Sequence, residues 1–196
     1  MAAASGAAAA PRRYPRGLPN TPTAALGNTN AQIAAQQPSG GDGEAEQRLI
    51  ELIEEYATRY NEAPNEMAQG ALRPERASAL CALIPDGTVR DWVGTIETLS
   101  STNDGRGILV ARISPHITVS TTNNAFSEDL STEKTLIPTG SPLFAQVAGM
   151  HTGQRIDFSG SLSRGQDCFR ETSLTVRGDM TAPDFEMQFT EVRLAQ

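Results

Sequence analysis

The chain has 196 residues, of which 5% are aromatic and 38% are hydrophobic, and its formal net charge is −7. A chain of this length is expected to hold one domain of about 100–200 residues with an extension. An acidic chain repels phosphate backbones unless its cations cluster, so the composition argues against general nucleic-acid binding.

Residues 1–43 are rich in Ala, Pro, Gly, Asn, Thr and Gln and show neither helical nor strand periodicity. Such a segment buries too little apolar surface to offset the entropy cost of ordering, so we predict a disordered tail or linker. Its basic cluster, Arg12, Arg13 and Arg16, follows the apolar run at 7–10, which reverses the order of a signal peptide. No run approaches the roughly 20 apolar residues of a membrane span. We expect a cytoplasmic protein, or an exported one whose leader segment has been removed.

Residues 44–84 predict a helical segment. The first helix, at about 46–60, has one apolar face that repeats at helical spacing: Leu49, Leu52, Ile53, Tyr56 and Tyr60. Pro64 ends this helix, because proline disfavours the helical conformation of the residue before it. Pro74 suits the first turn of a second helix, whose apolar stripe includes Leu80 and Cys81. For residues 65–73, between the two helices, a further helical turn is the alternative to a loop.

Strand periodicity begins after Pro85. Five strands are expected within residues 88–195: 89–99, 107–113, 117–121, a fourth with Ile156, Phe158 and Leu162, and a fifth with Phe185, Met187, Phe189, Val192 and Leu194. The apolar alternation slips by one residue near Thr190 and Glu191, as a β-bulge would cause. Residues 168–176 predict an extra strand or hairpin arm.

A short helix is expected at 142–149, with Ser141 as its cap and Pro142 in its first turn. Residues 126–141 before it are expected to form a long polar connection. Three strands, a helix and two strands is the element order of the OB-fold, a partly open Greek-key barrel. The predicted architecture is therefore mainly β: a disordered tail at 1–43, a helical segment at 44–84, and a five-stranded OB-like barrel at 85–196.

Six short stretches carry a resemblance to a known set of proteins: Asn61 to Glu66, Arg73 to Arg76, Asp91 to Gly94, Thr135 to Ile137, Phe158 to Gly160, and Glu171 to Thr175. Together they resemble uncharacterised bacterial proteins in which a short helical region precedes an OB-like domain of the tRNA-anticodon-binding-like kind. The resemblance covers roughly residues 45–195. It implies the fold and carries no functional residues over to this chain.

Cysteine and histidine are scarce: Cys81, Cys168, His116 and His151 are the only ones, and no pair has zinc-binding spacing. We expect no metal site and no cofactor. The preferred interpretation of the cysteines is two buried thiols. The alternative is one disulfide between helix and barrel, which would imply an oxidising compartment.

No catalytic arrangement is recognisable. Neither histidine lies in a motif that would make it a base for a nucleophile. Asp157 and Glu171 are expected on solvated strand faces, and Gly105-Arg106-Gly107 is better explained as a hairpin turn than as a phosphate loop. The sequence therefore does not indicate an enzyme.

The predicted barrel also lacks the features of a single-strand binder. If the core set includes Ile108, Val110, Ile117, Val119, Ile156, Phe158 and Phe185, the opposite face carries Thr118, Ser120, Arg155, Asp157, Ser159, Glu186 and Gln188. That face has no aromatic ladder on which bases could stack. Residues 85–196 hold 9 Arg and Lys against 14 Asp and Glu, and the single Trp92 is expected in the core.

We therefore expect a non-catalytic binding or assembly module that recognises a protein partner or a second copy of itself. The partner-binding candidates are Leu49, Leu52, Ile53, Tyr56 and Tyr60, whose face either packs on the barrel or docks on a partner. The alternative function is single-stranded nucleic-acid binding by the OB-like domain.

Overall fold

The structure is a computed structural model that describes residues 41–196, with side chains from residue 43 onward. The disorder predicted for residues 1–43 lies outside the described residues up to residue 40. Helix α1 already begins at Gly41, so the helical segment starts earlier than expected.

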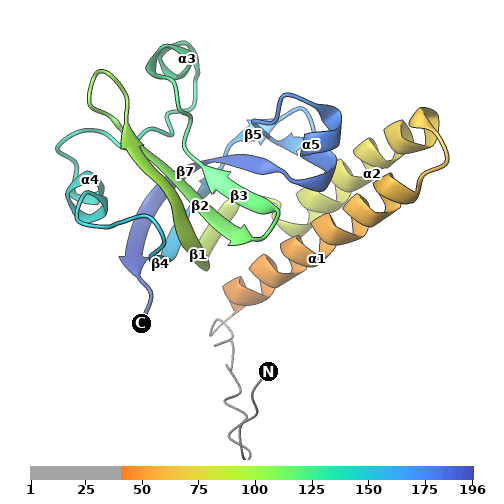
Figure 1. Ribbon diagram of the computed structural model, residues 1–196, viewed down its shortest axis with the longest axis horizontal. Helices are drawn as coiled ribbons and strands as arrows, with labels where there is room; N and C mark the ends of the chain where they lie inside the picture. Colours follow the sequence, from red (N-terminus) through yellow and green to blue (C-terminus); the bar gives the residue numbers. More distant parts are fainter. Residues whose placement is uncertain (1–40) are drawn as a thin grey trace, which may run out of the picture. The chain divides into compact units, whose positions relative to one another are not determined.

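Five strands form the centre of the described region, as expected: β1 (Thr88–Ser101), β2 (Gly107–Ser114), β3 (Ile117–Ser120), β4 (Arg155–Leu162) and β7 (Asp184–Leu194). They pair in the order β1-β2-β3-β7-β4, and β4 pairs again with β1, so the sheet closes into a barrel (Figure 1). Every pair is antiparallel except β3 with β7, which run parallel. The sheet is therefore mixed.

The predicted phase slip in the last strand is confirmed. Ser159 lies opposite Glu191 while Gly160 lies opposite Phe189, so Thr190 is the extra residue of a bulge. A Cβ at Gly160 would lie 2.1 Å from the carbonyl oxygen of Gln188. Only glycine fits where the two strands approach this closely.

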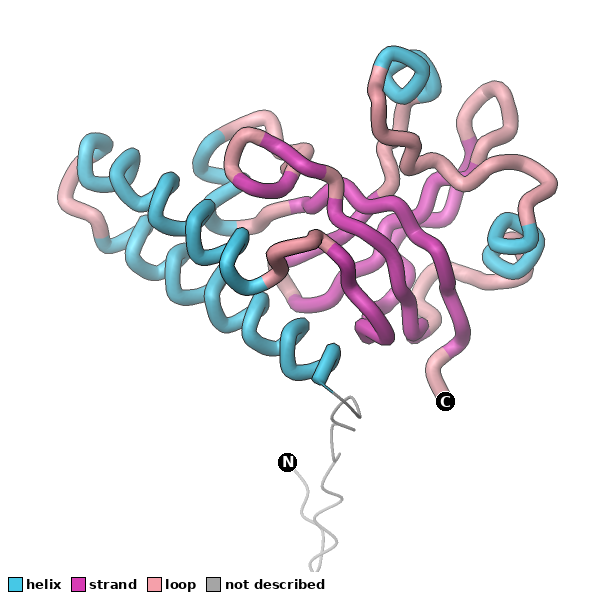
Figure 2. The backbone as a smooth tube through the Cα atoms, turned by 180° about the vertical axis from the view of Figure 1, so that it is seen from behind, coloured by secondary structure: helices cyan, strands magenta, loops and turns pink. Residues whose placement is uncertain are grey.

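Two long helices, α1 (Gly41–Glu62) and α2 (Glu66–Leu83), form a hairpin that covers one side of the barrel, and Figure 2 shows the pair from behind. The main core runs continuously from these helices into the barrel, where Trp92 is 1% exposed and its ring meets Phe158 edge to face at 6.5 Å. Helices occupy about as many described residues as strands. The expectation of a mainly β chain was therefore too narrow, because it left out the full length of these two helices and two short ones.

Pro74 does not begin a helix, contrary to prediction. Helix α2 starts eight residues earlier, where the Asn65 side chain accepts a hydrogen bond from the amide of Ala68 at 3.0 Å. Proline inside a helix costs about 3 kcal/mol. Packing of Leu72 and Leu80 against α1 and the barrel offsets that cost, and it is a tertiary effect that local sequence does not reveal.

Shorter elements fill the connections between strands. Helix α4 (Pro142–Val147) confirms the predicted short helix, with Ser141 accepting a hydrogen bond from the Phe144 amide at 3.1 Å. Of residues 168–176, expected as an extra strand or hairpin arm, only β6 (Cys168–Phe169) is a strand. It pairs with β5 (Arg164–Gly165) to form the β5–β6 arm, and helix α5 (Val176–Thr181) follows. The connection after β3 is not a plain loop, because it contains helix α3 (Ala125–Leu130).

The preferred interpretation of the cysteines as free thiols is wrong. Cys81 in the last turn of α2 and Cys168 in β6 form a disulfide, with Cα atoms 5.5 Å apart and a sequence separation of 87. A separation of this length carries no spacing signal. The bond joins the helical hairpin to the β5–β6 arm.

Candidate functional site

The predicted partner-binding face of α1 is buried within the chain. Leu49 and Ile53 are 0% and 1% exposed in the main core. Tyr56 and Tyr60 lie in a second cluster with Leu72 and Met180, and Leu52 is partly buried beside both clusters. This conformation corresponds to the first of the two expected outcomes, in which the helix packs on its own barrel. A partner would have to contact other residues.

The residues considered for chemistry are not brought together. His116 lies in the β2–β3 turn and His151 follows α4, and both are exposed. Asp157 is half-buried on β4. In the region from 41 to 196, no group of three or more His, Cys, Asp or Glu side chains could hold a metal ion.

Glu171 is not on a solvated face, contrary to prediction. Its side chain is 5% exposed and pairs with Arg76 of α2, which is 1% exposed and lies 5.9 Å from the ring of Phe185. Burial raises the pKa of Glu171, while the hydrogen bond from Arg76 acts in the opposite direction. Strand alternation could not show this, because the segment after β6 packs against α2 rather than facing water.

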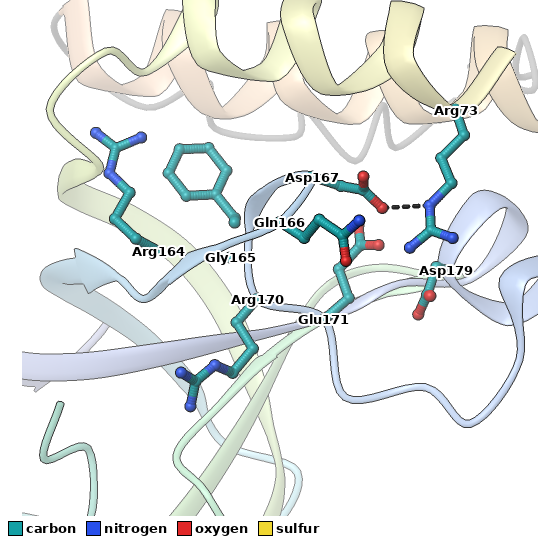
Figure 3. A pocket seen from close by; sticks show the side chains of 9 residues that line it. Arg73, Arg164, Gly165, Gln166, Asp167, Arg170, Glu171 and Asp179 are labelled. Carbon is teal, nitrogen blue, oxygen red and sulfur yellow. Dashed lines mark hydrogen bonds and ion pairs between the residues drawn. The ribbon is translucent and has the colours of Figure 1, made fainter. Parts of the chain in front are cut away.

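A polar pocket of about 280 Å³ lies beside this buried pair, between α2, the β5–β6 arm and α5 (Figure 3). Arg73 enters it from α2 and pairs with Asp167, and Arg170 pairs with Glu186 at 3.2 Å. Desolvation raises the pKa of Asp179, which lies near Arg73 in the same pocket. These ion pairs join α2 to the β5–β6 arm and the end of the arm to β7, so we assign the cluster a structural role.

The barrel face considered for nucleic acid is less exposed than expected. Ser120 and Glu186 are buried. The Ser120 hydroxyl donates a hydrogen bond to the Asp184 carboxylate at 2.8 Å, and Glu186 pairs with Arg170, so both buried polar side chains have a partner. Val110, expected in the core, is only half-buried. Among exposed large hydrophobic side chains of residues 43–196, Phe126 is the one aromatic. The described surface therefore presents no aromatic ladder for stacking bases.

Helix α3 stands out because a short element is held by many polar contacts. Asn124 caps it by accepting hydrogen bonds from the amides of Phe126 and Ser127. Glu128, which is 2% exposed, accepts a hydrogen bond from the Leu136 amide at 2.6 Å. Six helical residues are too few to be stable alone, so these contacts fix the helix in place.

Arg106 joins α3 to the β1–β2 hairpin. Its guanidinium pairs with Glu128 at 2.8 Å, with Asp129 at 2.9 Å and with Asp104 in its own loop at 2.7 Å. The hydrogen bond from Arg106 lowers the pKa of Asp104 to about 2, and Thr102 acts in the same direction. The hairpin loop and α3 therefore form one charged, hydrogen-bonded unit.

The apolar side chains of this fixed helix point to solvent. Phe126 is 71% exposed and Leu130 is 74% exposed, and the two lie one helical turn apart on the same side. We call these two residues the α3 apolar pair. They fall in the predicted polar connection and were missed. The signal was available, since Asn124 is a good cap and the pair has i, i+4 spacing.

In the region from 41 to 196, no helix has both the length and the apolar character required to cross a membrane. No protein-family model, curated protein or solved structure matches the chain. Function must therefore be argued from the molecule's own surface.

Proposed function

We propose that this protein is a non-catalytic interaction or assembly module that binds a protein partner through the α3 apolar pair. The observation that carries the proposal is that polar contacts fix α3 in place while its apolar side chains stay exposed to solvent. Glu128 and Arg106 connect α3 to neighbouring segments through an ion pair and hydrogen bonds, yet Phe126 and Leu130 project into solvent. Burying such side chains is worth about 1.5–3 kcal/mol each, and the described residues leave this free energy available to a partner.

The barrel that carries α3 is, in this proposal, of the OB type. Its strand order, its one parallel pair between β3 and β7, and the helix α4 between β3 and β4 all support that assignment. OB folds use the loops around the barrel for recognition. The β1–β2 hairpin is one of the loops that OB folds use to bind ligands, and Arg106 joins α3 to it, so the α3 apolar pair lies beside a recognition loop.

We infer the compartment from the disulfide. Disulfides persist in oxidising environments and are rare in the cytosol of most organisms. The Cys81–Cys168 bond therefore favours an exported protein over the cytoplasmic one first expected from the sequence.

The proposal is tested by affinity capture from the native host with the full chain as bait. Replacing the α3 apolar pair by serine, Phe126→Ser with Leu130→Ser, should abolish recovery of the partner protein, because the contact area is lost. The matched control is Met67→Ser, which removes an 88% exposed apolar side chain from α2.

Equal recovery by the wild type and the α3 double variant would refute the proposal. So would recovery of RNA or single-stranded DNA in place of protein, which would support the nucleic-acid alternative. Thermal unfolding of each bait checks that the substitutions leave the fold intact.

A further inference from the structure

An apolar pocket of about 250 Å³ opens at the base of the β1–β2 hairpin. Its apolar lining comes from β1, β2, α4 and the segment before α4: Leu99, Gly107, Ile137, Phe144, Val147 and Ala148. Only Ser100 and Ser101 add polar side chains. Its size and lining suit one large apolar side chain rather than a charged ligand.

The absence of a side chain at Gly107 shapes this pocket. A Cβ there would lie 3.2 Å from the Cβ of Ile137 and 3.3 Å from the ring of Phe144. The backbone of Gly107 also exchanges hydrogen bonds with Ile137, at 2.8 and 3.0 Å. The wall of the pocket is therefore held by main-chain pairing and does not depend on a mobile loop.

The pocket and the α3 apolar pair are joined through the hairpin. Figure 1 shows the β1–β2 hairpin between α3 and α4. Arg106 at the hairpin base contacts α3, and the next residue, Gly107, contacts the pocket wall. The two apolar features thus belong to one end of the barrel.

The charges around this end are mainly negative. The hairpin loop and the segment from α3 to residue 134 carry four acids, Asp104, Glu128, Asp129 and Glu133, against two bases, Arg106 and Lys134. The side chains of Asp104 and Asp129 are 50% and 63% exposed. Helix α4 carries no charged residue. A ligand that covers this end meets carboxylates beside apolar surface.

We infer that the partner presents a basic, amphipathic polypeptide segment, which places one large apolar side chain in the pocket and covers the α3 apolar pair with others. This inference rests on the proposed function and specifies its ligand. Lysine or arginine next to the apolar anchors would share Asp104 and Asp129 with Arg106, because both carboxylates are half-exposed or more. A second copy of this chain would bring the same acidic rim, and like charges would oppose association.

The test is fluorescence anisotropy of the full chain with a labelled synthetic peptide of about 15 residues, built from leucine and lysine at helical spacing. A peptide with glutamate in place of lysine is the charge control. Ala148→Phe fills the pocket from the exposed end of α4. Ala145→Phe, on the same helix but outside the pocket lining, is the matched variant.

We expect the lysine peptide to bind and the glutamate peptide not to bind. Ala148→Phe should weaken the affinity about tenfold or more, and Ala145→Phe should leave it within about twofold. Raising the salt concentration should weaken binding of the lysine peptide, because salt screens attraction between exposed charges.

Equal affinity of the Ala148→Phe variant and the wild type would overturn the inference, and so would equal binding of both peptides. If Phe126→Ser with Leu130→Ser weakens binding while Ala148→Phe does not, the proposed function stands and the pocket inference falls. If neither variant matters, both fall. A dimer by light scattering that Ala148→Phe dissociates would also overturn it, in favour of a second copy.

Discussion

Two regions on different sides of the barrel each hold a helix with an Arg–Glu ion pair, but the apolar side chains of the helices point in opposite directions. On the side of α1 and α2, the buried pair Arg76–Glu171 holds the helices, and their apolar faces point inward. On the side of α3, the pair Arg106–Glu128 holds a helix whose apolar residues point outward. We call the first region sealed, because the apolar faces of its helices are buried, and the second region displayed, because the apolar side chains of its helix are exposed. The two regions differ in the direction of their apolar side chains, and on this difference we base the proposal that the α3 side binds a partner.

The largest effect should come from placing a charge in the sealed region. Ile53→Asp buries a carboxylate in the main core, and we expect a loss of on the order of 4 kcal/mol or more in unfolding free energy. Phe126→Asp is the counterpart in the displayed region and should change stability by less than about 0.5 kcal/mol. Urea denaturation of both variants measures the contrast. Similar losses in the two variants would remove the distinction between the regions.

Breaking the buried ion pair should come next. Arg76→Met leaves the Glu171 carboxylate buried without its cation, which costs about 3–5 kcal/mol. Combining it with Glu171→Leu should recover most of that loss, because no charge then remains to be desolvated. Chemical denaturation at neutral pH tests both. A double variant as unstable as the single one would show that Arg76 acts through packing alone.

Removing the disulfide should have an intermediate effect confined to the sealed side. Cys81→Ala with Cys168→Ala should lower stability by about 2–4 kcal/mol, since the bond closes a long loop. Hydrogen exchange should show faster exchange in the last turn of α2 and in the β5–β6 arm. Unchanged protection there, or loosening of α3 instead, would contradict the assignment of the disulfide to the helical side.

The last effect depends on pH and concerns Glu46, which fixes the start of α1 to the barrel. Its carboxylate accepts a hydrogen bond from the Val93 amide at 2.9 Å, and burial raises its pKa from 4.5 to about 7. A carboxyl whose pKa is raised on folding stabilises the fold fully below pH 4.5 and loses that contribution as the pH rises to 7. The slope is about 1.4 kcal/mol per pH unit.

Glu46→Gln should remove this slope and make the protein relatively more stable at pH 8 than at pH 5, compared with the wild type. Denaturation midpoints across that range measure it. Glu51→Gln, at an exposed position of α1, is the matched control and should leave the slope unchanged. If the stability of the wild type and of Glu46→Gln changes equally with pH over this range, Glu46 is hydrated and its pKa is not raised.

Patterns of local periodicity predicted much of this fold. Alternation of Phe185, Met187 and Phe189 identified the last strand, and the slip at Thr190 identified its bulge. Ser141 followed by Pro142 identified α4. In each case the determining forces are local, because they depend on side-chain direction and on the residues that satisfy a helix end.

Features that depend on distant segments were missed. Glu186 and Ser120 alternate as if exposed, but Arg170 and Asp184 from neighbouring segments cover them. The pairing of Cys81 depends on where the β5–β6 arm packs. The α3 apolar pair was missed for a different reason, since its segment was judged by overall polarity and not by the spacing of Phe126 and Leu130.

Site-specific photo-crosslinking in the native host compares the two regions most directly. A photoreactive residue replaces Ser127 on α3 in one version of the full chain and Glu51 on α1 in another, both exposed positions. The account predicts a defined crosslinked protein adduct from position 127 and none from position 51. An adduct from position 51, or none from position 127, would contradict the claim that the α3 end is the binding surface.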